Sequence, residues 1–172
     1  MGMLAVGSSA RADHGHGRDT LRAKLKGFGE VPVNSTTGSG ELRLTIDDDE
    51  QSIDFVLKYR DLEGLTTTAA HIHLGQKDVN GGVSVFFCGG GGRPACPPDS
   101  ATITGTIVPA DVIGPAGQGI AAGEFAELLR ALRAGKTYVN VHTDKHPPGE
   151  IRGQIGRDDD DDDDHGHGHD HH

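Results

Sequence analysis

Between residues 20 and 156, apolar and polar residues alternate with a period of two along short segments. Leu42, Leu44 and Ile46 share one face of such a segment, and polar side chains share the other, which is typical of a half-buried strand. Turn residues separate the segments. The pattern predicts strands at residues 20–28, 40–46, 52–59, 68–74, 83–88, 100–108, 137–143 and 149–155.

One segment has a helical period instead. From residue 124 to residue 134, apolar side chains recur at positions i, i+3, i+4 and i+7, and Gly135 follows as a stop signal. The repeating residues are Phe125, Leu128, Leu129 and Leu132. The chain is therefore predicted to be a mainly β, antiparallel, Greek-key-like β-sandwich with one packed α-helix.

The length of 172 residues is that of one domain with tails. We assign residues 1–12 to a signal-peptide remnant, 13–19 to a His/Gly tail, 20–156 to the domain and 157–172 to an Asp/His-rich tail, both tails being expected to be disordered. No stretch approaches the roughly 20 apolar residues that cross a bilayer, so membrane insertion is not expected.

The formal net charge of −10 comes mainly from the C-terminal tail. Eight of the 26 acidic residues lie there, and the remaining 18 nearly balance the 16 lysines and arginines. Phosphate binding needs a basic surface. We therefore expect no nucleic-acid partner.

Two features favour an exported protein, periplasmic or extracellular. Ala10-Arg11-Ala12 resembles a signal-peptidase site, although the apolar segment before it is short, and an unstructured chain end is the alternative. The only cysteines, Cys88 and Cys96, flank a Gly-rich loop. We predict a disulfide between them, as in an oxidising compartment, rather than a metal-binding pair.

The four histidines of the domain fall into two close pairs, His71 with His73 and His142 with His146. Residues two apart on a strand share a face, so two imidazoles project together from residues 71 and 73. Imidazole-rich sites suit copper or zinc. We predict a body site made of all four histidines, with structural histidines as the alternative.

The tails carry a second group of histidines. The sequence DHGHG occurs twice, and glycine spacing allows neighbouring imidazoles to converge on one ion. We expect weak, multi-ion binding here, assisted by the run of Asp residues. The seven tail histidines are His14, His16, His165, His167, His169, His171 and His172.

Several motifs resemble the CHRD family, named for the domain repeated in chordin. They include LKGFGEVPVNSTTGSGELRLTIDDD, TTTAAHIHLG and YVNVHTDKHPPGEIRGQI, within residues 20–156. The resemblance implies an extracellular β-sandwich without a shared, well-established activity. The HIH strand also resembles the copper-binding strand of copper/zinc superoxide dismutases, although the His-rich loop of their zinc site has no counterpart here.

Three functions follow as hypotheses. The first is an exported protein that stores, delivers or buffers a transition metal, copper before zinc. The second is an interaction module with structural histidines that binds an extracellular protein or glycan. The last is a dismutase-like copper enzyme, with Arg152 or Lys145 to guide the anion. No catalytic motif supports an enzyme, so we expect a binding protein.

Overall fold

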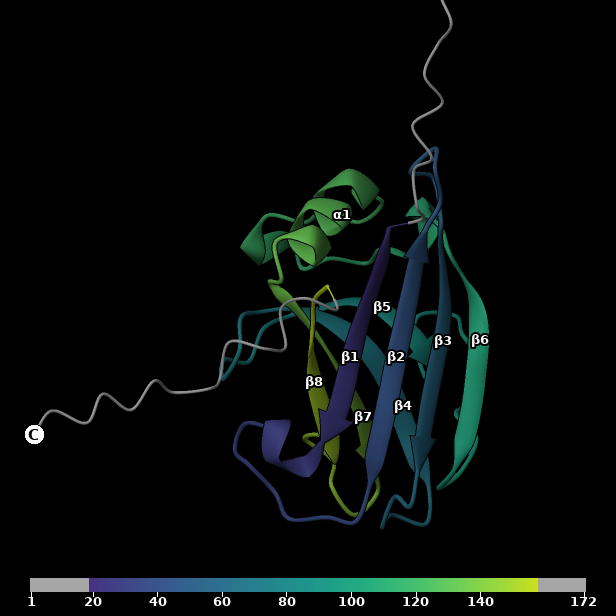
Figure 1. The fold of residues 1–172 in the computed structure, drawn as a ribbon, viewed down its shortest axis with the longest axis vertical. Helices are drawn as coiled ribbons and strands as arrows, with labels where there is room; N and C mark the ends of the chain where they lie inside the picture. Colours follow the sequence, from purple (N-terminus) through teal and green to yellow (C-terminus); the bar gives the residue numbers. More distant parts are fainter. Residues whose placement is uncertain (1–18, 158–172) are drawn as a thin grey trace, which may run out of the picture.

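The computed structural model describes residues 19–157 and shows one antiparallel sheet folded into two layers (Figure 1). The predicted leader, nearly all of the two tails and the seven tail histidines lie outside these residues. The strands are β1 (Thr20–Lys26), β2 (Ser39–Ile46), β3 (Ile53–Arg60), β4 (Thr67–Leu74), β5 (Val83–Cys88), β6 (Ala101–Ile107), β7 (Thr137–Thr143) and β8 (Ile151–Ile155). The helices are α1 (Phe125–Arg133) and the short 3-10 turns η1 (Gly27–Gly29), η2 (Pro109–Asp111) and η3 (Ala116–Gln118).

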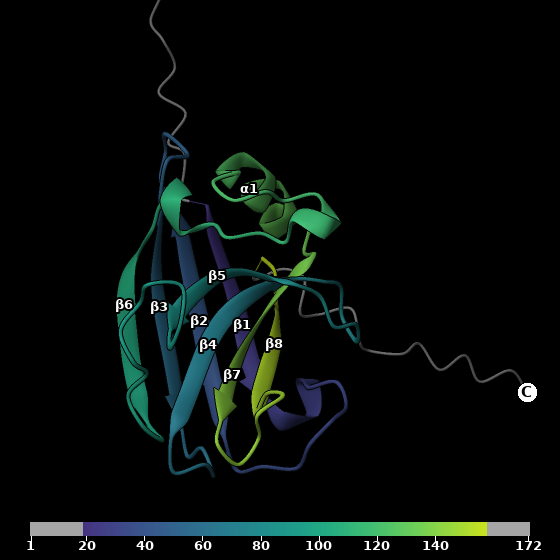
Figure 2. The same ribbon diagram turned by 180° about the vertical axis from the view of Figure 1, so that it is seen from behind.

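The strand order is β5-β4-β7-β8-β1-β2-β3-β6. Strands β1, β2, β3 and β6 form the front layer in Figure 1, and β8, β7, β4 and β5 form the back layer, which faces the viewer in Figure 2. Pairing of Lys26 on β1 with Arg152 on β8 makes the two layers one continuous sheet. The predicted antiparallel sandwich is therefore confirmed.

The core lies between the layers and follows from the alternation in the sequence. In the β2–β3 hairpin, Leu42 lies opposite Leu57 and Leu44 lies opposite Phe55, and all four side chains are buried. Their neighbours along the strands, such as Lys58, are exposed. This hairpin has one apolar face and one solvated face, as its sequence predicts.

The predicted helix is confirmed within one residue at each end. The four repeating apolar residues of α1 are all buried in the core. Both views place α1 across one end of the two layers (Figures 1 and 2). The helix thus closes an end of the sandwich that the strands leave open.

The first strand ends earlier than predicted. Strand β1 stops at Lys26, and Phe28 lies in η1 with 76% of its surface exposed. Gly29 packs so closely on β8 that a Cβ atom there would lie 2.4 Å from the carbonyl oxygen of Arg152. The two glycines therefore allow a tight turn that replaces the last residues of the predicted strand.

The predicted disulfide is confirmed. Cys88 at the end of β5 is bonded to Cys96, and their Cα atoms are 5.0 Å apart. Gly89 adopts a φ of 74° with its backbone against Thr68, where a side chain would not fit. In the described part of the chain, no helix is both long and apolar enough to cross a membrane.

Candidate metal centre

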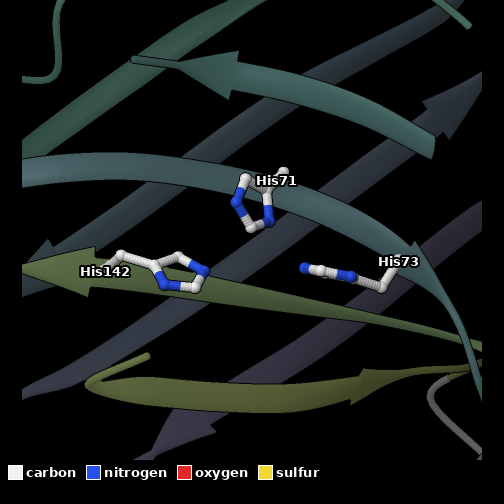
Figure 3. A group of neighbouring side chains, drawn as sticks. All are labelled: His71, His73 and His142. Atoms are coloured by element: carbon white, nitrogen blue, oxygen red, sulfur yellow. The ribbon is translucent and has the colours of Figure 1, made fainter. Parts of the chain in front are cut away.

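Three histidines converge on the outward face of the back layer. His71 and His73 project from β4 and His142 projects from β7, and Figure 3 shows the three rings turned toward one another. One ring nitrogen from each lies within 4.8 Å of the other two. The ring centroid of His71 is 4.5 Å from those of both His73 and His142.

The β4–β7 ladder produces this arrangement. His71 pairs with Asn140, and His142 pairs with Ala69, two residues before His71 on the same face. The small side chain of Ala69 leaves room for the imidazole of His142 to lean toward His71. Register shifts on either side of the His71–Ile72 pair, where β4 meets β5, bend the strand locally. Ile72 points into the core, as predicted.

Burial keeps the three imidazoles neutral. His71 and His73 are 6% and 8% exposed, and desolvation disfavours the charged form of each ring. Desolvation, together with the neighbouring His142 and His73, lowers the pKa of His71 to about 3. The pKa values of His73 and His142 are also lowered, chiefly by burial. A neutral imidazole is the form that binds a metal ion.

Two rings are oriented by backbone carbonyls. Nδ1 of His142 lies 2.8 Å from the carbonyl oxygen of Pro147, and Nδ1 of His73 lies 2.8 Å from that of Gly81. Since a carbonyl can only accept, each Nδ1 carries the proton and each Nε2 carries the lone pair. Metal-binding histidines commonly have this arrangement, in which the second nitrogen donates to a fixed acceptor.

The nitrogens that face the centre lack protein donors. Nε2 of His142 and Nδ1 of His71 are buried and have no hydrogen-bond partner among residues 19–157. A tetrahedral ion with bonds of 2.0–2.1 Å separates its ligand atoms by about 3.3 Å, so the rings close inward on binding. An ion of this kind would require the three rings to move inward from their present separation. The residues present therefore fit an imidazole-bound transition metal.

His146 is outside this group, so the structure brings together three of the four predicted histidines. It lies in the β7–β8 connection, where its N–H donates to the hydroxyl of Thr143. The N–H of Gly149 donates to the carbonyl oxygen of His146, so the two prolines lie in a tight turn that leads to β8.

Glu150 and Asp144 form hydrogen bonds in and around the same connection. Glu150 is fully buried and accepts hydrogen bonds from the hydroxyls of Thr36 and Thr143. Asp144 accepts from the backbone N–H of Thr66. Thr36 lies in the β1–β2 loop, so this loop contributes to the burial of Glu150.

Sequence reasoning missed Tyr138, Asn140 and Glu30 around the centre, and it suggested Arg152 only as an anion guide. Asn140 and Tyr138 share the outward face of β7 with His142, and Tyr138 stacks on His73 with ring centroids 4.6 Å apart. Arg152 covers the other side of Tyr138, its guanidinium carbon 3.4 Å from the ring centroid, and Glu30 lies nearby. The spacing of two residues in Tyr138, Asn140 and His142 is the sequence feature that could have revealed the first two.

The sequence profile of the CHRD domain matches residues 21–155. This chain belongs to the CHRD family. No curated protein and no solved structure matches it. The CHRD assignment covers the whole sandwich and all three converging histidines, but it names no ligand for them.

Proposed function

We propose that this CHRD protein binds one transition-metal ion through His71, His73 and His142, and that it stores, delivers or buffers that ion. The observation that carries the proposal is the convergence of three imidazoles from two strands, with His71 and His73 buried and His142 half-buried. Two of them are already oriented through Nδ1, so little side-chain entropy is lost when an ion binds.

Copper is the ion that we propose first. Imidazole nitrogen suits both copper and zinc, and for such donors Cu²⁺ stands above Zn²⁺ in intrinsic affinity. Three protein ligands leave a position open for a further ligand, which a protein that passes its ion to a partner requires. The family and the Cys88–Cys96 disulfide support an exported location, where such exchange would take place.

The two cations suggested as anion guides are already engaged. Lys145 pairs with Glu63, and Arg152 is 3% exposed and donates to Asn80 and to backbone carbonyls. An enzyme that guides an anion to the ion needs an accessible cation. These contacts favour binding over dismutase chemistry.

The test measures copper and zinc binding by the full chain with the seven tail histidines replaced by serine. We expect one ion per chain. His71→Ala or His142→Ala should weaken binding at least about 100-fold, because mutation of residues that only hydrogen-bond to metal ligands already costs about 10–100-fold in affinity. His146→Ala is the matched control and should bind as the parent does. Equal binding by all of these variants would refute the three-histidine centre.

A further inference from the structure

The carboxyl group of Glu30 is buried near Asn140 and Arg152. Glu30 is 4% exposed, and its Oε1 atom is buried without a hydrogen-bond partner in the described chain. The backbone of Gly149 packs against it so closely that a Cβ atom there would lie 2.4 Å from Oε1. A buried, incompletely satisfied carboxyl is costly, so its position calls for a functional explanation.

Asn140 connects this carboxyl to the histidines. Its Oδ1 atom lies 3.1 Å from Nε2 of His73, while its amide hydrogen-bonds to the Glu30 carboxyl. Asn140 lies on β7 and is 4% exposed. Any change in hydrogen bonding at Glu30 is therefore transmitted to His73 through one amide.

The contact between Asn140 and His73 depends on which way the amide points. Nδ1 of His73 donates to Gly81, so Nε2 carries a lone pair and faces the lone pairs of Oδ1. A cation beside both atoms turns this repulsion into attraction. If the amide turns over, its N–H₂ group donates to Nε2 and occupies the lone pair, and Oδ1 then faces Glu30.

The reversed amide needs a protonated Glu30, because only a carboxylic acid can donate to Oδ1. With ionised Glu30, the carboxylate accepts from the amide N–H₂ group, and Oδ1 is directed to His73. The two amide orientations thus correspond to the two protonation states of Glu30.

We propose that Glu30 and Asn140 form a proton-controlled pair that decides whether Nε2 of His73 is free to bind an ion. The proposal rests on the proposed function. In the closed state, Glu30 holds a proton and Asn140 donates to Nε2. When Glu30 releases that proton to solvent, the amide turns, and the lone pair of Nε2 becomes available to the ion.

The surroundings of Glu30 place this switch near neutral pH. Burial raises the pKa of Glu30 to about 7, and the positive charge of Arg152 on β8 opposes the rise. The N–H of Val31 and the amide of Asn140 oppose it as hydrogen-bond donors. A bound cation would favour the carboxylate further. Burial lowers the pKa values of the three imidazoles and so favours their neutral forms.

The experiment is calorimetric titration with Zn²⁺ of the full chain with the seven tail histidines replaced by serine. Pairs of buffers with different ionisation enthalpies at pH 6 and pH 8 report the protons released. Linkage to one group that titrates near pH 7 predicts about tenfold weaker binding at pH 6 than at pH 8 and release of about 0.9 proton per ion at pH 6.

In Glu30→Gln, we expect the affinity for Zn²⁺ to be nearly equal at pH 6 and pH 8. The number of protons released per ion at pH 6 should fall by about 0.9. The control Glu41→Gln, at an exposed position of β2, should keep the parent's pH dependence. A Glu30→Gln protein that binds Zn²⁺ with the parent's pH dependence overturns the switch and leaves the proposed function intact.

A measurement on the unsubstituted protein covers the case in which Glu30→Gln does not fold. NMR titration of the Glu30 carboxyl carbon should show a midpoint near pH 7 without the ion and a lower midpoint with Zn²⁺. A midpoint near 4.5 in the ion-free protein overturns the inference. Absence of ion binding at both pH values instead defeats the proposed function, and the inference with it.

Discussion

On the front layer, the side chains that point away from the core are exposed, as Lys24, Arg43 and Lys58 are. On the back layer, the corresponding outward side chains, including His71, Asn140 and Arg152, are buried. Both layers contribute the same kind of apolar inner face to one core. They differ in what lies on their outer faces.

The difference distinguishes the apolar core, which stabilises the fold, from the polar outer face of the back layer. Burying polar groups contributes little net stability, and leaving one without a partner costs about 1–3 kcal/mol. The back layer contains several such groups, among them Nδ1 of His71 and Nε2 of His142. Stability therefore comes mainly from the shared core, and the buried outer face of the back layer is where we place function.

The largest expected effect tests the shared core. Leu57→Ala on β3 removes a fully buried side chain and should lower the free energy of unfolding by about 2–5 kcal/mol. The adjacent, exposed Lys58→Ala should change it by less than about 0.5 kcal/mol. Urea unfolding of both variants measures the contrast. Similar losses from both would mean that the inner face does not dominate stability.

A second effect concerns acid and the back layer. Burial holds the pKa of His71 at about 3 in the folded protein, below its usual 6.5. Below pH 6.5 the unfolded chain therefore takes up a proton at His71 that the folded protein does not. The free energy of unfolding decreases as the pH decreases. Between pH 7 and pH 4.5 the loss through His71 should be about 2–3 kcal/mol.

Glu30 acts in the opposite direction, since its raised pKa adds stability as the pH falls from about 7 toward 4.5. The comparison with His71→Leu in the presence of a chelator isolates the histidine, because Glu30 is present in both proteins. We expect the variant to lose less stability on acidification than the parent. Parallel pH profiles would show that His71 is protonated equally in the folded and unfolded states.

The smallest effect is a gain. At pH 7.5 and without metal, His71→Leu should raise the free energy of unfolding by about 1 kcal/mol, because it removes a buried nitrogen without a partner. The same variant should lose the ion, which separates binding from stability. Thermal or urea unfolding measures the gain. A clear loss of stability would indicate that His71 has a structural role.

Much of the fold could be predicted because each strand of the front layer has one apolar and one polar face. The alternation of Leu42, Leu44 and Ile46 identifies β2 and its inward side without knowledge of its neighbours. Phe28 shows where this reasoning stops. It lies within the strand predicted over residues 20–28, but β1 ends at Lys26 and Gly29 packs closely on β8.

The candidate site could be predicted only in part. The spacing of His71 and His73 places both on one face of β4, and that follows from strand geometry alone. The contribution of His142 depends on the β4–β7 register, which pairs it with Ala69. His146 was grouped with His142 because the two are close in sequence, yet the turn before β8 separates it from the centre.

The sequence by itself determined the strands, the helix, the disulfide between Cys88 and Cys96 and the shared face of two histidines. These depend on side chains a few residues apart along one chain, where backbone geometry sets the spacing. The tertiary structure decided the third histidine, the bridge from Asn140 to Glu30 and the burial that keeps the imidazoles neutral. Those depend on contacts between segments far apart in sequence, because desolvation and pairing register arise only when the layers pack.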